Sequence, residues 1–172
     1  MPLNEQRTTP ELFPVSAPLI PTKVLIVCMG NICRSPTAEA VLRSALAKAR
    51  LAVEVDSAGT ENYHVGAAPD SRAILHARRR GYQLEGLRAR QVIAADFLRF
   101  DLILAAEELN LSVLRRQCPP ELRHKLALFL GDHPLPDPYY GEGDGFEIVL
   151  DLVEERAAAL VNTWLTPTGP LD

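Results

Sequence analysis

A short apolar run that leads through a cysteine-containing loop into a helix constrains the fold of this chain more than any other feature. Residues 23–27 (KVLIV) are aliphatic and β-branched after a single lysine, which is the pattern of a buried strand. The loop CMGNICR follows at residues 28–34. Ser35 is then expected as a helix N-cap and Pro36 as the first helical residue, and apolar residues recur on one helical face from Ala38 to Ala49. These residues predict a strand, a tight loop and an amphipathic helix in direct succession.

The loop has the composition of an anion-binding site. Gly30 and Asn31 tolerate left-handed backbone, which a tightly curled loop needs. In such a loop successive N–H groups point at one spot, and the helix N-terminus adds positive potential there. The same surroundings favour the thiolate of Cys28, and Arg34 carries a rigid fork that can bind two phosphate oxygens. Although Cys-x5-Arg alone occurs by chance in many chains, the flanking strand and helix indicate covalent phosphoryl transfer to cysteine.

The rest of the chain alternates strand and helix patterns. We expect further strands at residues 53–55, 101–105 and 126–130, and helices at 69–80, 107–117 and from 144 to about 164. Asp144 and Glu147 have the spacing of a capping box. Strands separated by helices favour right-handed crossovers. The sequence predicts a single doubly wound α/β domain, with a four-stranded parallel sheet flanked by helices and a ligand site beyond the carboxyl end of the first strand.

Several motifs resemble one enzyme family. The loop C-x-G-N-I-C-R-S-P at residues 28–36 is similar to the signature of the low-molecular-weight protein tyrosine phosphatases. Further similar segments are residues 55–60 with Tyr63, Arg90–Gln91, Asn110 and Asp137–Gly141, and the resemblance extends from about residue 23 to about residue 164. It implies hydrolysis of phosphotyrosine monoesters through a phosphocysteine intermediate, without a metal or other cofactor. The implied partners are phosphotyrosine-containing proteins and a cognate tyrosine kinase.

The resemblance also implies a role for each residue of the motif. Cys28 would attack phosphorus, while Arg34 and the loop N–H groups would stabilise charge on the phosphoryl oxygens. Ser35 would donate a hydrogen bond to the thiolate. Asp137 would protonate the departing tyrosyl oxygen and then activate water, although an isolated aspartate before proline is more typical of a turn. The loop residues expected to bind substrate are Met29, Gly30, Asn31, Ile32 and Cys33.

Aromatic residues are expected to form the walls of the site. Tyr63, Tyr139 and Tyr140 resemble the family's pocket walls, and a half-buried surface tyrosine is an equal alternative for Tyr140. The four histidines receive no role: His64, His76, His124 and His133. The run Arg78–Arg80 is expected to be a solvated helix end that satisfies the helix dipole.

Polar residues beside the loop are expected to hold its shape. Asn31, Ser57 and Glu39 resemble residues that lock it through side-chain hydrogen bonds, and a first-turn glutamate favoured by the helix dipole is the alternative for Glu39. Two positions depart from the family pattern. Leu87 stands where bacterial relatives commonly carry histidine, and Ala106–Glu107 replaces a Met-Asp pair. Both departures are expected to affect the rigidity of the loop and the rate, and to leave the reaction class unchanged.

Composition and cysteine content agree with this class. The chain has 172 residues, 47% of them apolar, and a net charge of -4, so neither nucleic acid nor a membrane is expected as a partner. Three cysteines cannot form a disulfide scaffold, and two of them share one loop, which indicates the reducing cytoplasm. Five prolines precede residue 22. They predict a flexible arm over residues 1–21, followed by a phosphatase domain over 22–166 and a tail over 167–172.

Three alternative functions remain at this level. Arsenate reductases share the fold and loop but need further cysteines for a disulfide relay, for which Cys118 alone is insufficient. Protein-arginine phosphatases tend to carry threonine where this loop has Ile32. A phosphate-binding protein without activity would be expected to lose Cys28, Arg34 or Asp137.

The loop thiols also suggest redox sensitivity, with Cys28 as the most easily oxidised thiol and Cys33 as its disulfide partner.

Overall fold

The computed structural model describes residues 20–141 and 144–166. Four strands form one parallel sheet in the order β2-β1-β3-β4. They are β1 (Lys23–Cys28), β2 (Glu54–Gly59), β3 (Leu102–Ala105) and β4 (Leu126–Leu128). The predicted four-stranded parallel sheet is therefore confirmed. Nearly all of the expected N-terminal arm and the whole C-terminal tail lie outside the described residues.

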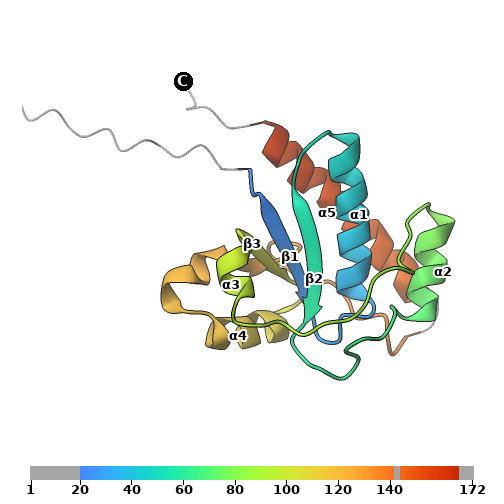
Figure 1. Ribbon diagram of the computed structural model, residues 1–172. Coiled ribbons are helices and arrows are strands. Elements are labelled where there is room, and N and C mark those ends of the chain that lie inside the picture. The colour runs from blue at the N-terminus through green and yellow to red at the C-terminus, as the bar shows by residue number, and fades with distance from the viewer. Residues whose placement is uncertain (1–19, 142–143, 167–172) are drawn as a thin grey trace, which may run out of the picture.

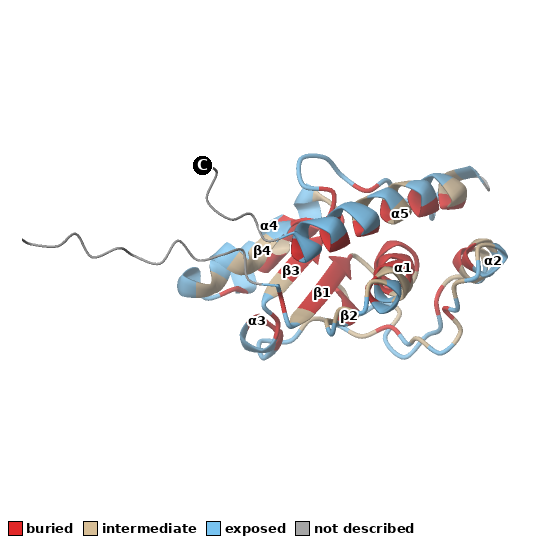
Figure 2. Cartoon of the chain, turned by 90° about the horizontal axis from the view of Figure 1, so that it is seen from above, coloured by how far each residue is buried: buried red, intermediate tan, exposed pale blue. Residues whose placement is uncertain are grey.

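Helices cover both faces of this sheet (Figure 1). The chain adds α1 (Arg34–Lys48), α2 (Ser71–Arg79), α3 (Asp96–Arg99), α4 (Glu108–Gln117), the 3-10 helix η1 (Pro120–Lys125) and α5 (Asp144–Leu165). Figure 2 shows buried residues concentrated in the strands and on the inward faces of α1 and α5. No helix in the described part of the chain is long and apolar enough to span a bilayer.

The alternation of side chains along β1 divides the core into two clusters. Val24 and Ile26 pack with α1, α2 and α5, whereas Leu25 and Val27 pack with α3 and α4 on the other face. Because both faces of the central strand are covered, β1 reads as a continuous apolar run instead of an alternating one. The sheet holds the carboxyl end of β1 rigidly, and Cys28 is its last residue.

The structure corrects several predicted boundaries. Helix α1 begins at Arg34 with Cys33 as its N-cap residue, so the assignment of Ser35 as N-cap is wrong. Helix α2 is shorter than expected and is capped by Asp70, whose carboxylate accepts the Arg72 N–H at 2.8 Å. Strand β2 extends further than residues 53–55, and β4 ends before residue 130. The short helices α3 and η1 had no predicted counterpart.

Contacts between α2 and α5 contradict two predictions, the capping box at Glu147 and the solvated end of α2. Helix α5 begins at Asp144 itself, and the Glu147 carboxylate binds His76, at 2.7 Å from Nδ1, and Arg80 instead of completing a capping box. Arg80 also forms ion pairs with α5, with partners Asp151 and Glu154 at 2.9 and 2.8 Å. The end of α2 is therefore paired with α5 and is not simply solvated. These contacts join two helices that each follow a wall of the site described next.

Candidate active site

The loop between β1 and α1 curls around the sulfur of Cys28. Asn31 adopts φ 56°, so the expected left-handed residue is confirmed at this position. Gly30 has no such φ, and a Cβ there would lie 2.9 Å from Cδ2 of His64, so a side chain at this position would require the His64 ring to shift. The Asn31 N–H donates to the Cys28 sulfur at 3.3 Å, and the Ser35 hydroxyl lies 3.0 Å from it. Both groups therefore lie within hydrogen-bond distance of the sulfur.

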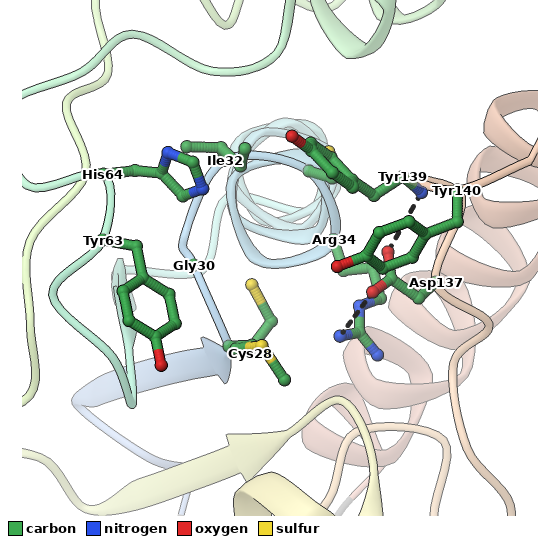
Figure 3. Close-up of a pocket in the computed structure, with 11 residues that line it drawn as sticks. Cys28, Gly30, Ile32, Arg34, Tyr63, His64, Asp137, Tyr139 and Tyr140 are labelled. Atoms are coloured by element: carbon green, nitrogen blue, oxygen red, sulfur yellow. Dashed lines mark hydrogen bonds and ion pairs between the residues drawn. The ribbon is translucent and has the colours of Figure 1, made fainter.

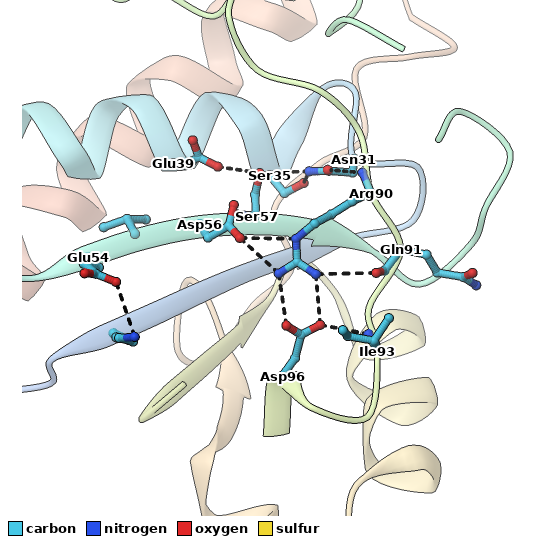
Figure 4. Close-up of polar contacts among 12 residues, drawn as sticks. Asn31, Ser35, Glu39, Glu54, Asp56, Ser57, Arg90, Gln91, Ile93 and Asp96 are labelled. Atoms are coloured by element: carbon cyan, nitrogen blue, oxygen red, sulfur yellow. Dashed lines mark hydrogen bonds and ion pairs between the residues drawn. The ribbon is translucent and has the colours of Figure 1, made fainter. Parts of the chain in front are cut away.

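A buried hydrogen-bond network fixes the direction of the Ser35 hydroxyl (Figure 4). The side-chain amide of Asn31 donates to Ser35 Oγ at 2.7 Å and to Ser57 Oγ at 2.9 Å, while its Oδ1 accepts the Arg90 N–H at 3.1 Å. Since Ser35 Oγ already accepts from Asn31, its own hydrogen is free to point at Cys28. The Ser35 hydroxyl can thus donate to the sulfur of Cys28, and a hydroxyl engaged in this way does not cap α1.

The same network continues into α1 and the loop before α3. Ser57 Oγ donates to Oε1 of Glu39 at 2.8 Å, and burial raises the pKa of that carboxyl above its ordinary value. Arg90 contacts Asp56 at 3.0 Å and the buried Asp96 at 3.0 Å. The expected grouping of Asn31, Ser57 and Glu39 is therefore present as direct contacts. Arg90, which carried no predicted role, anchors the segment that binds Asn31.

Arg34 extends from the first turn of α1 to the opposite side of the site. Its side chain is 3% exposed, and Nη1 donates to the carbonyl of Leu135 at 3.2 Å. Glu107 Oε2 lies 3.3 Å from Nη1, and Asp137 Oδ2 lies 3.5 Å from Nη2. Glu107, one of the two departures from the family pattern, thus contacts the arginine of the motif. Leu87, the other, packs against the apolar cluster around α1.

Asp137 lies on the loop that leads toward α5. Its Oδ1 accepts the N–H of Tyr139 at 3.0 Å, an aspartate turn that fixes the carboxylate next to Arg34. The rings of Tyr139 and Tyr140 meet edge to face with centroids 4.9 Å apart. Tyr140 is 87% exposed, so it forms the outer rim of the site.

These elements enclose a cavity of about 280 Å³ over Cys28. Tyr63 and His64 lie across it from Asp137, Tyr139 and Tyr140 (Figure 3). The predicted residues that line it are Cys28, Met29, Gly30, Ile32, Cys33, Arg34, Tyr63, Asp137, Tyr139 and Tyr140. Asn31 does not line the cavity, because its side chain belongs to the network below the loop. His64 lines it without having been predicted, and its place directly after Tyr63 is the only sequence signal for it.

A cysteine beneath an anion-binding loop, opposed by an arginine and an aspartate, defines a phosphoryl-transfer site of the cysteine-dependent type. The model of the family "Low molecular weight phosphotyrosine protein phosphatase" matches residues 23–166. The chain belongs to this family.

Relatives and solved structures agree with this assignment. A low molecular weight protein-tyrosine-phosphatase of Streptomyces coelicolor is 43% identical over 150 residues, which cover 81% of this chain and 91% of that protein. The crystal structure of a protein tyrosine phosphatase from Entamoeba histolytica has a TM-score of 0.79 at 38% identity, covering 82% of this chain and 95% of that one. Wzb of Vibrio vulnificus, solved in complex with benzylphosphonate, has a TM-score of 0.75 at 33% identity and covers 82% and 97%.

Proposed function

We propose that the protein hydrolyses phosphotyrosine monoesters in proteins through a phosphocysteine intermediate. The observation that carries this proposal is the position of the Cys28 sulfur at the floor of the cavity, with the Ser35 hydroxyl at 3.0 Å and the Asn31 N–H at 3.3 Å. Arg34, at the end of the same loop, and Asp137, on the loop before α5, lie together at the other side of the cavity. A nucleophile, an anion-binding group and a proton donor therefore converge on one volume.

The first step transfers the phosphoryl group to sulfur. The Cys28 thiolate attacks phosphorus, and the bond from phosphorus to the tyrosyl oxygen breaks. Asp137 gives its proton to that oxygen, which makes tyrosine a better leaving group. Arg34 and the loop N–H groups other than that of Asn31, which donates to the sulfur, stabilise the charge on the three phosphoryl oxygens.

The second step returns the enzyme to its starting state. Asp137, now ionised, takes a proton from a water molecule as that water attacks the phosphorus of phosphocysteine. The bond from phosphorus to sulfur breaks, inorganic phosphate forms, and Cys28 leaves as a thiolate. The Ser35 hydroxyl stabilises this thiolate, because the Asn31 amide leaves its hydrogen free to point at the sulfur.

An aromatic phosphate ester fits the walls of the cavity. Tyr63 and Tyr139 provide apolar surface on both sides, and Ile32 adds an apolar residue between them. The Vibrio vulnificus relative was solved with benzylphosphonate, which carries a phosphonate next to an aromatic ring. We therefore propose phosphotyrosine-containing proteins as substrates and a cognate tyrosine kinase as their source.

The two alternatives on the same scaffold have less support. Ile32 offers no polar group to a guanidinium, which a phosphoarginine substrate would carry. Cys118 is buried in the apolar cluster that packs on the other face of the sheet from α1. It donates to the carbonyl of Pro119 at 3.4 Å and burial raises its pKa, so it is poorly suited to relay a disulfide from Cys28.

Assays of the wild-type chain test the proposed function. We expect kcat/KM to be higher for a phosphotyrosyl peptide than for the same peptide with phosphoarginine, and we expect no thiol-dependent reduction of arsenate. Release of inorganic phosphate and dephosphorylated peptide in equal amounts is the measurement. A preference for phosphoarginine would contradict the substrate assignment and favour the arginine phosphatase alternative.

We also propose that the protein works in the cytoplasm and that its site is redox-sensitive. Cys28, Cys33 and Cys118 are all free thiols. Peroxide would convert the Cys28 thiolate to a sulfenic acid, and the Cys33 thiol would then displace water from it to form a disulfide. Burial, with the Asp70 carboxylate as a second cause, raises the pKa of Cys33 to about 12. Cys33 is therefore protonated at neutral pH and reacts through a small thiolate fraction.

Cys33→Ser should lose this protection. After peroxide treatment and then a thiol reductant, the wild type should regain more activity than the variant, and its advantage should grow as the pH of the peroxide step rises. Activity recovery at several pH values, with mass spectrometry of the oxidised protein, is the measurement. Equal recovery of both proteins, or a bond from Cys28 to Cys118, would contradict the role of Cys33.

A further inference from the structure

Arg72 connects the two loops of the active site without lining the cavity between them. It is the second residue of α2, and its side chain is 42% exposed. Nη2 lies 2.9 Å from Oδ2 of Asp70 and donates to the carbonyl of Tyr139 at 3.1 Å. The guanidinium carbon also lies 4.8 Å from the centre of the Phe146 ring, at the start of α5. One exposed side chain therefore joins α2 to the loop of Asp137.

On one side, Arg72 is fixed through Asp70 to the loop around Cys28, residues 28–34, which we call the phosphate-binding loop. The Asp70 carboxylate accepts three hydrogen bonds from Arg72, two from the guanidinium and one from the backbone N–H. These bonds hold the pKa of that carboxyl below its ordinary value. The N–H of Asp70 donates to the carbonyl of Ile32 at 2.8 Å. Since Ile32 lies in the loop around Cys28, the guanidinium has a fixed position relative to that loop.

On the other side, Arg72 holds the residue that orients Asp137. The carbonyl of Tyr139 accepts from Arg72, and the N–H of Tyr139 donates to the Asp137 carboxylate at 3.0 Å. The Arg72 guanidinium also lies over the Tyr139 ring, 5.6 Å from its centre. Both the backbone and the ring of Tyr139 are thus constrained by the same side chain. Without it, Tyr139 loses the hydrogen bond and the ring contact that tie it to Asp70, although Asp137 keeps its own contact with Arg34.

We propose that Arg72 is a positioning residue for Asp137, which it holds at a fixed place above Cys28 through Tyr139. This inference rests on the proposed function, in which Asp137 is the acid of the first step. Small displacements of a reacting group are costly in rate, because proton transfer needs a defined distance and direction. Arg72 would therefore act on the chemistry while touching neither substrate nor the reacting atoms.

The test compares leaving groups. Arg72→Ala should lower kcat/KM for phenyl phosphate by roughly 10-fold to 10²-fold, the scale of a misplaced reacting group. The loss should be much smaller for 2,4-dinitrophenyl phosphate, whose leaving group needs little protonation. In an Asp137→Ala background, Arg72→Ala should have almost no further effect, because the group that it positions is gone. Arg72→Lys, which keeps the charge but not the forked geometry, should fall between the alanine variant and the wild type.

Arg78→Ala is the matched control, since Arg78 lies on the same helix and pairs with Glu85 instead of the active-site loops. It should leave the dependence on leaving group unchanged. The inhibition constant for inorganic phosphate should stay the same in all single Arg72 variants, because Arg34 and the loop N–H groups remain. An equal loss of kcat/KM across leaving groups, or additive losses in the Arg72→Ala, Asp137→Ala double variant, would overturn the proposal.

The proposal and the function on which it rests can fail separately. If the loss of kcat/KM in Asp137→Ala depends on the leaving group but the loss in Arg72→Ala does not, only the positioning role is wrong. If Asp137→Ala itself shows no such dependence, the assignment of the acid falls and the role of Arg72 falls with it. Thermal unfolding midpoints of each variant identify a loss that comes from misfolding. Should Arg72→Ala fail to fold, the same comparison of leaving groups with Arg72→Lys decides the question.

Discussion

Cys28→Ser should abolish turnover of aryl phosphates while the protein still binds inorganic phosphate. The anion-binding groups remain in this variant, because Arg34 and the loop N–H groups do not depend on the sulfur. A serine hydroxyl in the same place has no base to ionise it: the hydroxyl of Ser35 and the N–H of Asn31 are its neighbours, and neither takes up a proton readily. Steady-state assays should therefore show no product above the uncatalysed background, and calorimetric titration should still detect the binding of inorganic phosphate to the variant.

Cys118→Ser is the matched control for this substitution. Cys118 is as buried as Cys28, at 3% exposure each, but it packs on the other face of the sheet. The Cys118→Ser variant should therefore keep wild-type turnover. Rapid denaturation during turnover of a phosphorus-labelled substrate should trap covalent phosphate in the wild type and in Cys118→Ser, and none in Cys28→Ser. Steady turnover by a preparation of Cys28→Ser free of wild-type protein would remove Cys28 from the role of nucleophile.

The strand, loop and helix around Cys28 could be predicted because their signals are local. The four apolar residues Val24–Val27 define β1, and the periodicity that follows defines α1. Two details were wrong: Gly30 has no left-handed φ, and the helix begins at Arg34 instead of Pro36. At Ser35 a local capping signal competes with a contact to the Cys28 sulfur seven residues earlier. A hydroxyl that serves the site cannot also cap the helix, and capping statistics contain no information about that choice.

Contacts between distant segments could not be predicted from local patterns. Glu107 and Leu135 reach Arg34 from 73 and 101 residues away, and Arg72 reaches Tyr139 across 67 residues. His64 joins the cavity only because β2 ends beside β1 and sends the next loop over Gly30. Each of these depends on the order of strands in the sheet. The sequence indicated the four strands and the longer helices, but not α3 or η1, and the packing of the sheet decided which side chains meet.

Asp137→Ala should lower kcat/KM for phenyl phosphate by roughly 10²–10⁴-fold, the usual contribution of a positioned acid. The loss should shrink as the leaving group becomes more acidic, because such a group departs without help from a proton donor. The alanine variant alone is ambiguous, since it also removes the acceptor of the Tyr139 N–H and can disturb the loop. Kinetics with a series of substituted phenyl phosphates measure the dependence on the leaving group.

Asp137→Asn separates the chemistry from the shape of the loop. Its side-chain carbonyl can still accept the Tyr139 N–H, which Asp137 now binds at 3.0 Å, but an amide cannot supply the proton in the first step or take one from water in the second. The asparagine and alanine variants should therefore lose similar amounts of kcat/KM for phenyl phosphate. Since the asparagine variant keeps the turn, its loss reports the proton transfer. Near-wild-type activity of Asp137→Asn would mean that Asp137 only shapes the loop and that another group supplies the proton.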